Sequence, residues 1–365
     1  MDGDAFIIAA IAAEQEARKA GEPTYQEGCG AIEDVQAAET GTAQIGLERA
    51  GEPEMSTHFA RTVGERERQA AQEHARMMMA SAVKRDEGKR WNGHCGARRY
   101  ENGRGYVLPG EPTGTLVAAM DGAYFAPGPP GSTRAVVYLT DIFGLPLKNS
   151  KLMADELARA LACDVWVPDL FNGKPFMAVD ELEPLMPDRA GVAMTLGQKL
   201  QAGFLMLRRA PSLYANRPSV TAARAAALIA RLRAEKGYAR VGAVGYCYGG
   251  ALAVRLAADA AVLDAVVVCH PGGISAEQVR AIAVPAAWAC AESDMSFGPA
   301  LRQEAEALFR AREGKEGFVE YEFVDYKGTA HGFACRPNLS VPEVKAGYEG
   351  ALAQTIAWFN KTLPA

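Results

Sequence analysis

The stretch from Val241 to Val254 constrains the fold of this chain more than any other. It reads Val-Gly-Ala-Val-Gly-Tyr-Cys-Tyr-Gly-Gly-Ala-Leu-Ala-Val, so an apolar run passes through Gly-x-Cys-x-Gly directly into an alanine-rich helical pattern. A strand, a sharp turn and a helix in that order are typical of a nucleophile elbow, whose turn lifts the central side chain above the end of a parallel sheet. Gly245 and Gly249 stand where side chains would collide, and Cys247 takes the central place. The alternative is an inert buried cysteine in a glycine-rich turn.

The rest of the chain supports the elbow, because from about Trp91 short apolar runs alternate with helical patterns. That alternation predicts an α/β fold with a mostly parallel central sheet flanked by helices. Helices are expected over residues 222–236 and 342–362, and Asn149 is expected to cap a third. Several runs are apolar on every residue, as in strands buried on both faces. The expected strands cover residues 135–140, 164–168, 240–245, 264–269, 284–289 and 319–325.

Residues 1–90 differ from residues 91–365 in amino-acid composition. They are rich in Ala, Glu, Gln, Gly and Arg, with almost no aromatic residues, so burial cannot easily offset the entropy lost on ordering. We therefore predict a disordered or partly helical extension, with a helix over about residues 64–84, followed by one domain over residues 91–365. The acidic start and the absence of a long apolar run predict a cytoplasmic protein without a membrane partner.

Composition narrows the function classes. The formal net charge of −5 gives no reason to expect a nucleic-acid partner, which requires a concentrated basic face. The seven cysteines are odd in number, irregularly spaced and form no CxxC pair, so a disulfide framework or a zinc site is not expected. We expect a monomer.

Partners for Cys247 are sought in the order nucleophile, acid, base. Asp294 follows the strand expected over 284–289 and is the predicted acid, with Glu292 as the second choice. His331 follows the last expected strand and is the predicted base. The carboxyl ends of parallel strands meet at one edge of the sheet, where α/β folds build their sites. His270 also follows a strand, but it would break the usual order, so a structural or supporting role is expected for it.

Two backbone amides are predicted to stabilise an oxyanion at this edge. The helix that starts behind Cys247 places the Tyr248 N–H beside the sulfur, and its dipole favours a thiolate and an oxyanion. The segment Thr140-Asp-Ile-Phe-Gly144 follows the first apolar strand, where this arrangement takes its second N–H donor, here assigned to Ile142.

Taken together, these motifs resemble the dienelactone hydrolase (carboxymethylenebutenolidase) family of the α/β-hydrolase superfamily over about residues 91–365. The resemblance rests on five motifs in the same order, namely Asp141-Ile-Phe-Gly144, Val167-Pro-Asp-Leu-Phe-Asn-Gly173, Gly245-Tyr-Cys-Tyr-Gly-Gly250, Glu292-Ser-Asp294 and Ala330-His-Gly-Phe333. It implies an α/β-hydrolase fold and hydrolysis of a small ester or enol-lactone by a Cys247-His331-Asp294 triad through a thioester. It implies no cofactor.

Two positions depart from the family pattern. Members with lactone activity carry a glutamate at the position of Asp141, whose shorter side chain reaches less far. They also bind a substrate carboxylate with an arginine shortly after the histidine, whereas here Arg336 is shifted in register behind Cys335. Asp141 and Arg336 are thus candidate substrate-binding or supporting residues, and a solvated surface arginine is the alternative for Arg336.

Other functions remain open on the sequence alone. A thioesterase or another acyl hydrolase of the same fold would use the same triad, and only a substrate panel separates it from an esterase. A non-catalytic α/β-hydrolase-like interaction module would be expected to have lost part of the triad, and all three residue types are present in order.

Overall fold

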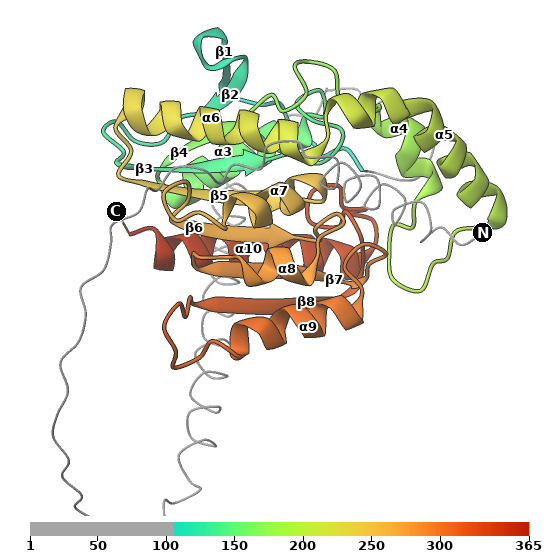
Figure 1. Ribbon diagram of the computed structural model, residues 1–365. Coiled ribbons are helices and arrows are strands. Elements are labelled where there is room, and N and C mark those ends of the chain that lie inside the picture. The colour runs from blue at the N-terminus through green and yellow to red at the C-terminus, as the bar shows by residue number, and fades with distance from the viewer. Residues whose placement is uncertain (1–105, 365) are drawn as a thin grey trace, which may run out of the picture. The chain divides into compact units, whose positions relative to one another are not determined.

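The computed structural model describes residues 106–364, so the predictions for residues 1–90 lie outside the described residues. The described chain forms one eight-stranded sheet in the order β1-β2-β4-β3-β5-β6-β7-β8 (Figure 1). From β4 to β8 the neighbouring strands are parallel, while β2 pairs antiparallel with β1 and β4. The strands are β1 (Thr115–Val117), β2 (Ala123–Ala126), β3 (Arg134–Leu139), β4 (Asp164–Val167), β5 (Arg240–Tyr246), β6 (Ala265–Cys269), β7 (Ala286–Ser293) and β8 (Tyr321–Ala330).

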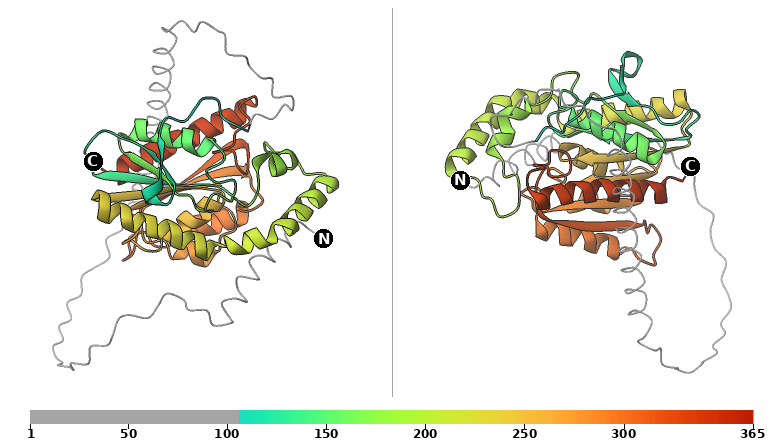
Figure 2. Two further views of the ribbon diagram at one scale, coloured as in Figure 1. Left: turned by 90° about the horizontal axis from the view of Figure 1, so that it is seen from above. Right: turned by 180° about the vertical axis from the view of Figure 1, so that it is seen from behind.

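Helices cover both faces of the sheet. Helices α3 and α10 pack on one face, and α6, α7, α8 and α9 pack on the other, as the two turned views show (Figure 2). A further pair, α4 and α5, lies beyond the carboxyl ends of the strands (Figure 1). The helices are η1 (Ala118–Met120), α3 (Asn149–Leu161), α4 (Val179–Leu182), η2 (Glu183–Leu185), α5 (Leu196–Ala215), α6 (Pro218–Lys236), α7 (Tyr248–Leu256), α8 (Ala276–Arg280), α9 (Pro299–Arg310) and α10 (Pro342–Thr362).

The apolar strands separate two hydrophobic cores. In β3, Val137 and Leu139 pack with the α6–α9 side, whereas Val136 and Tyr138 pack with α3 and α10. Alternate side chains of a strand point to opposite faces, so a strand buried on both sides must be apolar throughout. The predicted mostly parallel sheet flanked by helices is confirmed.

Two local predictions are corrected by the structure. Strand β7 runs on to Ser293 and β8 to Ala330, so both strands extend further toward the site than their apolar runs indicate. Asn149 does not cap α3: it is the helix's first residue, and Lys148 is at the cap position. Its side chain instead accepts a hydrogen bond from Leu108 N and donates to Cys335 O, at 2.9 Å each. The Asn149 side chain thus bonds backbone groups that are distant in the sequence instead of the first turn of α3.

None of the helices within residues 106–364 has the length and apolar character required to cross a bilayer. The expectations of a cytoplasmic monomer without nucleic-acid or membrane partners stay predictions.

Candidate active site

Cys247 lies between β5 and α7 in a strained backbone conformation. Its φ and ψ are 54° and −114°, a region that residues other than glycine seldom adopt, at a cost of roughly 1–3 kcal/mol. Two hydrogen bonds hold the turn, from Cys247 N to Cys269 O at 3.1 Å and from Gly272 N to Cys247 O at 2.8 Å. The side chain is partly exposed, unlike the other cysteines within residues 106–364, all of which are buried. The elbow thus presents its thiol at the sheet edge.

The flanking glycines allow this turn. A Cβ on Gly245 would lie 2.1 Å from the carbonyl oxygen of Gly249, and a Cβ on Gly249 would lie 2.1 Å from that of Leu139. Backbone atoms cannot move away as a flexible side chain can. Both glycines are therefore required by close packing of strand, turn and helix, as the sequence pattern indicates.

His331 and Asp294 meet at the same edge. The carboxylate oxygens of Asp294 both lie 3.0 Å from His331 Nδ1. Asp294 Oδ1 also accepts hydrogen bonds from Ser296 N at 2.8 Å and Phe297 N at 3.1 Å, which fix its orientation. The carboxylate is 1% exposed and the imidazole 12%. A buried acid thus holds Nδ1 and leaves Nε2 available for chemistry.

The charges of this pair stabilise each other. Burial favours the neutral acid, but the His331 charge and the hydrogen bonds from His331 and Ser296 outweigh it and lower the pKa of Asp294 to about 2. Burial likewise opposes the charged imidazole, yet the Asp294 carboxylate and the Cys247 side chain raise the pKa of His331 well above its ordinary value. Hydrogen bonds to Asp294 and Cys247 contribute to that increase. His331 therefore links the acid to the thiol.

The two alternatives considered from the sequence lie elsewhere. Glu292 accepts a hydrogen bond from Gly328 N at 2.6 Å and faces Lys327, so it does not take the place of Asp294. His270 is fully buried, and its ring centroid lies 5.0 Å from that of His331. Burial and the nearby positive charges of His331 and Arg336 lower its pKa well below the ordinary value. His270 is a neutral ring that packs against the predicted base.

The predicted oxyanion donors follow two neighbouring strands at the same height. Leu139 of β3 pairs with Gly245 of β5, and Ile142 and Tyr248 each lie three residues further along. The Tyr248 hydroxyl donates to Asn216 O at 2.6 Å, which fixes the residue that begins α7. The register brings both backbone amides to the edge where Cys247 lies, and their role in binding an oxyanion stays a prediction.

Asp141 and Arg336 meet in a buried ion pair. The Arg336 side chain is 6% exposed, and it hydrogen-bonds both Asp141 and Glu183. Its guanidinium also lies over the Phe143 ring, 4.9 Å from the centroid. Asp141 in turn accepts a hydrogen bond from Phe143 N at 3.0 Å, which orders the loop after β3. The alternative of a solvated surface arginine is wrong.

Sequence reasoning missed Glu183 and the position of Cys335. Glu183 begins η2, far from every motif, and no local pattern marks it as a partner of Arg336. Cys335 is buried beside the pair, with its sulfur 3.6 Å from Asp141 Oδ2 and 3.9 Å from His270 Nε2. A small pocket opens beside the base, lined by Tyr106, Glu183, Pro187, Asp188, His331, Phe333, Arg336 and Asn338.

The search for a metal site among residues 106–364 finds no group of three or more His, Cys, Asp or Glu side chains placed to hold an ion.

Several known hydrolases are similar to this chain. Residues 120–363 match the model of the dienelactone hydrolase family. Hydrolase pyvD of Aspergillus violaceofuscus is 30% identical over 269 residues, which cover 71% of this chain and 94% of that protein. The mouse carboxymethylenebutenolidase homolog is 28% identical over 240 residues, 66% of this chain and 86% of its own length. A crystal structure of a putative dienelactone hydrolase from Klebsiella pneumoniae aligns with a TM-score of 0.46 at 18% identity, over 66% of this chain and 92% of that one.

Proposed function

This chain belongs to the dienelactone hydrolase family and is a hydrolase, and from that premise we propose that it cleaves small esters or enol-lactones with Cys247 as nucleophile. The observation that carries the proposal is the position of His331, which bonds the Asp294 carboxylate through Nδ1 and interacts with the Cys247 side chain. Nucleophile, base and orienting acid in that relation form the arrangement used for acyl transfer.

In the first half-reaction, the Cys247 sulfur bonds to the substrate carbonyl carbon, and its proton resides on His331 Nε2. The carbonyl oxygen gains negative charge, which the N–H groups of Ile142 and Tyr248 stabilise. The carbon–oxygen bond to the alcohol then breaks, and His331 gives its proton to the leaving oxygen. A thioester to Cys247 remains.

In the second half-reaction, water attacks the thioester carbon while His331 accepts one of its protons. The carbon–sulfur bond breaks, the acid leaves, and the thiolate–imidazolium pair is restored. Asp294 stabilises the imidazolium in both halves, because its carboxylate is buried and ionised beside Nδ1. The contact of His331 with both partners favours this reading over a non-catalytic interaction module.

The test uses the full chain and p-nitrophenyl butyrate. Cys247→Ala is expected to lower kcat/KM by at least about a thousandfold, since removal of a triad nucleophile leaves only binding and oxyanion stabilisation. Iodoacetamide is expected to abolish wild-type activity, and mass spectrometry should locate the adduct on Cys247. The same panel with a butyryl thioester separates an esterase from a thioesterase.

Cys163→Ala is the matched control. This thiol directly precedes β4, at the amino ends of the parallel strands and therefore at the opposite edge of the sheet, and it is buried. Loss of a thiol there should leave turnover within a factor of two. Unchanged turnover in Cys247→Ala, with a circular dichroism spectrum like that of wild type, refutes the proposal.

A further inference from the structure

Besides His331, whose charge faces Asp294, the only cation that lines this pocket within residues 106–364 is Arg336, and it already has two carboxylate partners. Arg336 bonds Glu183 through Nε and Asp141 through Nη1, and Nη1 also lies 3.2 Å from the Cys335 sulfur. One positive charge therefore faces two negative charges, and the group as a whole is anionic. Guanidinium is the side chain best suited to bind a substrate carboxylate, but this one has its charge and two of its nitrogens engaged.

A further carboxylate adds to the negative character of the pocket. Asp188 lines the same cavity and is 19% exposed. It accepts a hydrogen bond from Asn338 Nδ2 at 2.8 Å, and it pairs with Arg189, which is 3.9 Å away and 50% exposed. A solvated arginine at that distance only partly offsets a carboxylate. The walls next to the base thus repel anions.

We propose that Glu183 is a specificity-determining residue that excludes carboxylate-bearing esters from this site and restricts it to substrates uncharged near the scissile bond. This inference rests on the proposed ester hydrolysis and names the substrate class of the same site. A substrate carboxylate that entered the pocket would lie close to Glu183 and Asp188, and both cations that line the pocket within residues 106–364, His331 and Arg336, are already paired with protein carboxylates. Interactions between charges are strong where water is excluded, and an unpaired buried carboxylate is unfavourable.

Glu183 acts from outside the catalytic triad. It belongs to η2, in the segment that contains α4 and α5, and it contacts neither Cys247 nor Asp294 in any hydrogen bond of the described chain. Its carboxylate is 14% exposed. Removal of its charge should therefore alter which esters are accepted without altering how His331 and Asp294 handle protons.

The experiment compares two esters of similar shape and different charge, p-nitrophenyl 4-methylpentanoate and p-nitrophenyl hemisuccinate. Wild type is expected to favour the neutral ester at least tenfold in kcat/KM, after subtraction of the uncatalysed rates. Glu183→Gln keeps the length of the side chain and an oxygen that accepts from Arg336, but it removes one negative charge. It should reduce the preference at least fivefold, chiefly by increasing turnover of the hemisuccinate. The intrinsic reactivities of the esters cancel when the two enzymes are compared.

Glu181→Gln is the matched control, because Glu181 lies two residues away and pairs with Arg209 rather than with a pocket residue. Its ester preference should equal that of wild type. Glu183→Asp keeps the charge. The logarithm of its ratio of kcat/KM values for the two esters should be at least half of the wild-type logarithm. As a measurement that needs no variant, an increase in NaCl from 0.05 to 0.5 M should reduce the wild-type preference, since salt screens partly exposed charges.

The outcomes separate the two proposals. If wild type hydrolyses neither ester, the proposed function fails. If it hydrolyses both and prefers the hemisuccinate or treats the two alike, the enzyme is an esterase and the exclusion of anions is wrong. An unchanged preference in folded Glu183→Gln also overturns the role of this residue.

Discussion

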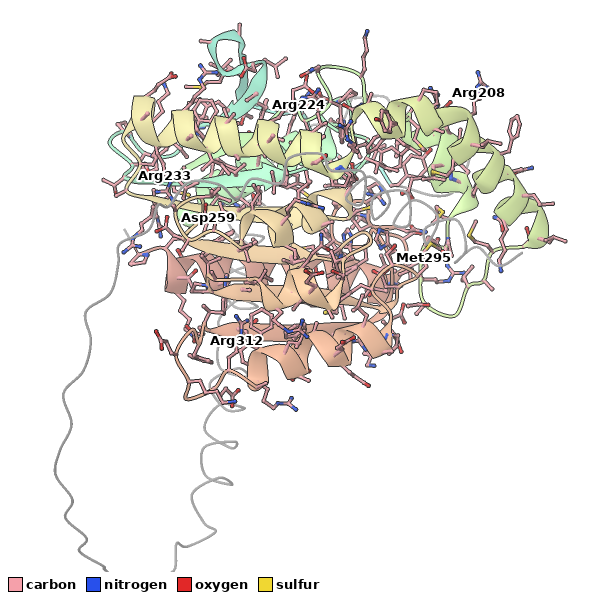
Figure 3. All side chains as sticks on the ribbon, in the orientation of Figure 1. Arg208, Arg224, Arg233, Asp259, Met295 and Arg312 are labelled. Carbon is pink, nitrogen blue, oxygen red and sulfur yellow. The ribbon has the colours of Figure 1, made fainter. Side chains whose placement is uncertain are left out.

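The sheet edge that carries Cys247 and the segment from Val179 to Ala215 differ in how they are held. The proposed nucleophile, Cys247, and the proposed acid, Asp294, follow β5 and β7, most of whose residues are buried. The proposed base, His331, follows β8, which pairs with β7 in the parallel sheet. The segment that contains α4, η2 and α5 contacts the core through Leu182 and through partly buried apolar side chains, and α5 buries none of its 20 residues fully. Arg208 of α5 extends away from the sheet (Figure 3).

Hydrogen bonds also join the two regions. Glu183 and Asp188 bond Arg336 and Asn338, and Ala190 N donates to Gly328 O at 3.1 Å. On the outer side, α5 presents its large apolar residues to solvent: Leu196, Leu200, Phe204, Leu207 and Tyr214 are 62–73% exposed. On the proposed function, the catalytic residues lie at the strand ends, whereas Glu183, the residue proposed to select the substrate, lies in a segment attached to them.

The largest expected effect on the catalytic side is that of Asp294→Asn. The amide keeps the size of the side chain but cannot stabilise the imidazolium or hold the required tautomer of His331. We expect kcat/KM for p-nitrophenyl butyrate to fall about 10³- to 10⁴-fold. The comparison with Glu292→Asn, a carboxylate nearby that does not touch His331, should show less than a threefold change. A loss below tenfold for Asp294→Asn contradicts the assigned role.

Gly249→Ala tests whether the sheet edge requires close packing of strand, turn and helix around Cys247. The new methyl group would lie 2.1 Å from the Leu139 carbonyl oxygen, so strand, turn or helix must shift. We expect a loss of about 3 kcal/mol in the free energy of unfolding, at the upper end of overpacked sites, together with loss of activity. Urea denaturation measures the free energy of unfolding. Wild-type stability in this variant would show that the elbow is less tightly packed than the structure indicates.

The pH dependence of stability tests the charge state of the Asp294–His331 pair. Asp294 has a pKa of about 2, below the 3.8 of a free side chain, so its contribution of about 2 kcal/mol is present above pH 4 and is lost as pH falls through 2. His331 has a raised pKa, so its contribution is complete below pH 6.5 and is lost as pH rises through the folded value. NMR of ¹⁵N-histidine-labelled protein should show His331 still protonated above pH 7.

Asp294→Asn provides the internal check on these pKa values. Without the carboxylate, the pKa of His331 should fall relative to wild type, because the main cause of its increase has been removed. The variant should also lose less stability than wild type between pH 4 and pH 2. A histidine pKa that does not change on this substitution would mean that another group holds the charge.

The sequence predicts the sheet edge better than it predicts the segment from Val179 to Ala215. Strands β3, β5, β6 and β7 are nearly unbroken apolar runs, and a polar residue just after such a run must lie at the sheet edge. Cys247 and Asp294 were accessible for that reason, and His331 because it follows the last expected strand in the order nucleophile, acid, base. The exact ends of β7 and β8 were not, because β7 ends in the exposed Glu292 and Ser293, and β8 passes through the exposed Lys327 before it ends.

Contacts between distant segments were beyond sequence reasoning. Arg336 and Glu183 are 153 residues apart, and Asn149 reaches a carbonyl 186 residues away. A capping residue is indicated by its local sequence, but the same side chain can bond to any backbone group that the fold brings close. The hairpin of β1 and β2 and the helix α5 escaped prediction as well, since neither contributes a run of fully buried residues.

The smallest expected effect belongs to the attached segment and comes from Gly203→Ala. No atom lies within 4 Å of the position that a Cβ would occupy, and the glycine is in the interior of α5. Alanine should stabilise the helix by about 0.8–1 kcal/mol through backbone entropy. Because α5 buries none of its residues fully, it is expected to open separately from the sheet, as weakly packed units do. Hydrogen exchange in α5 should then slow about fourfold while the urea midpoint of the sheet stays unchanged. A shift of the urea midpoint instead would show that α5 unfolds together with the strands, and the contrast between the two regions would be one of solvent exposure alone.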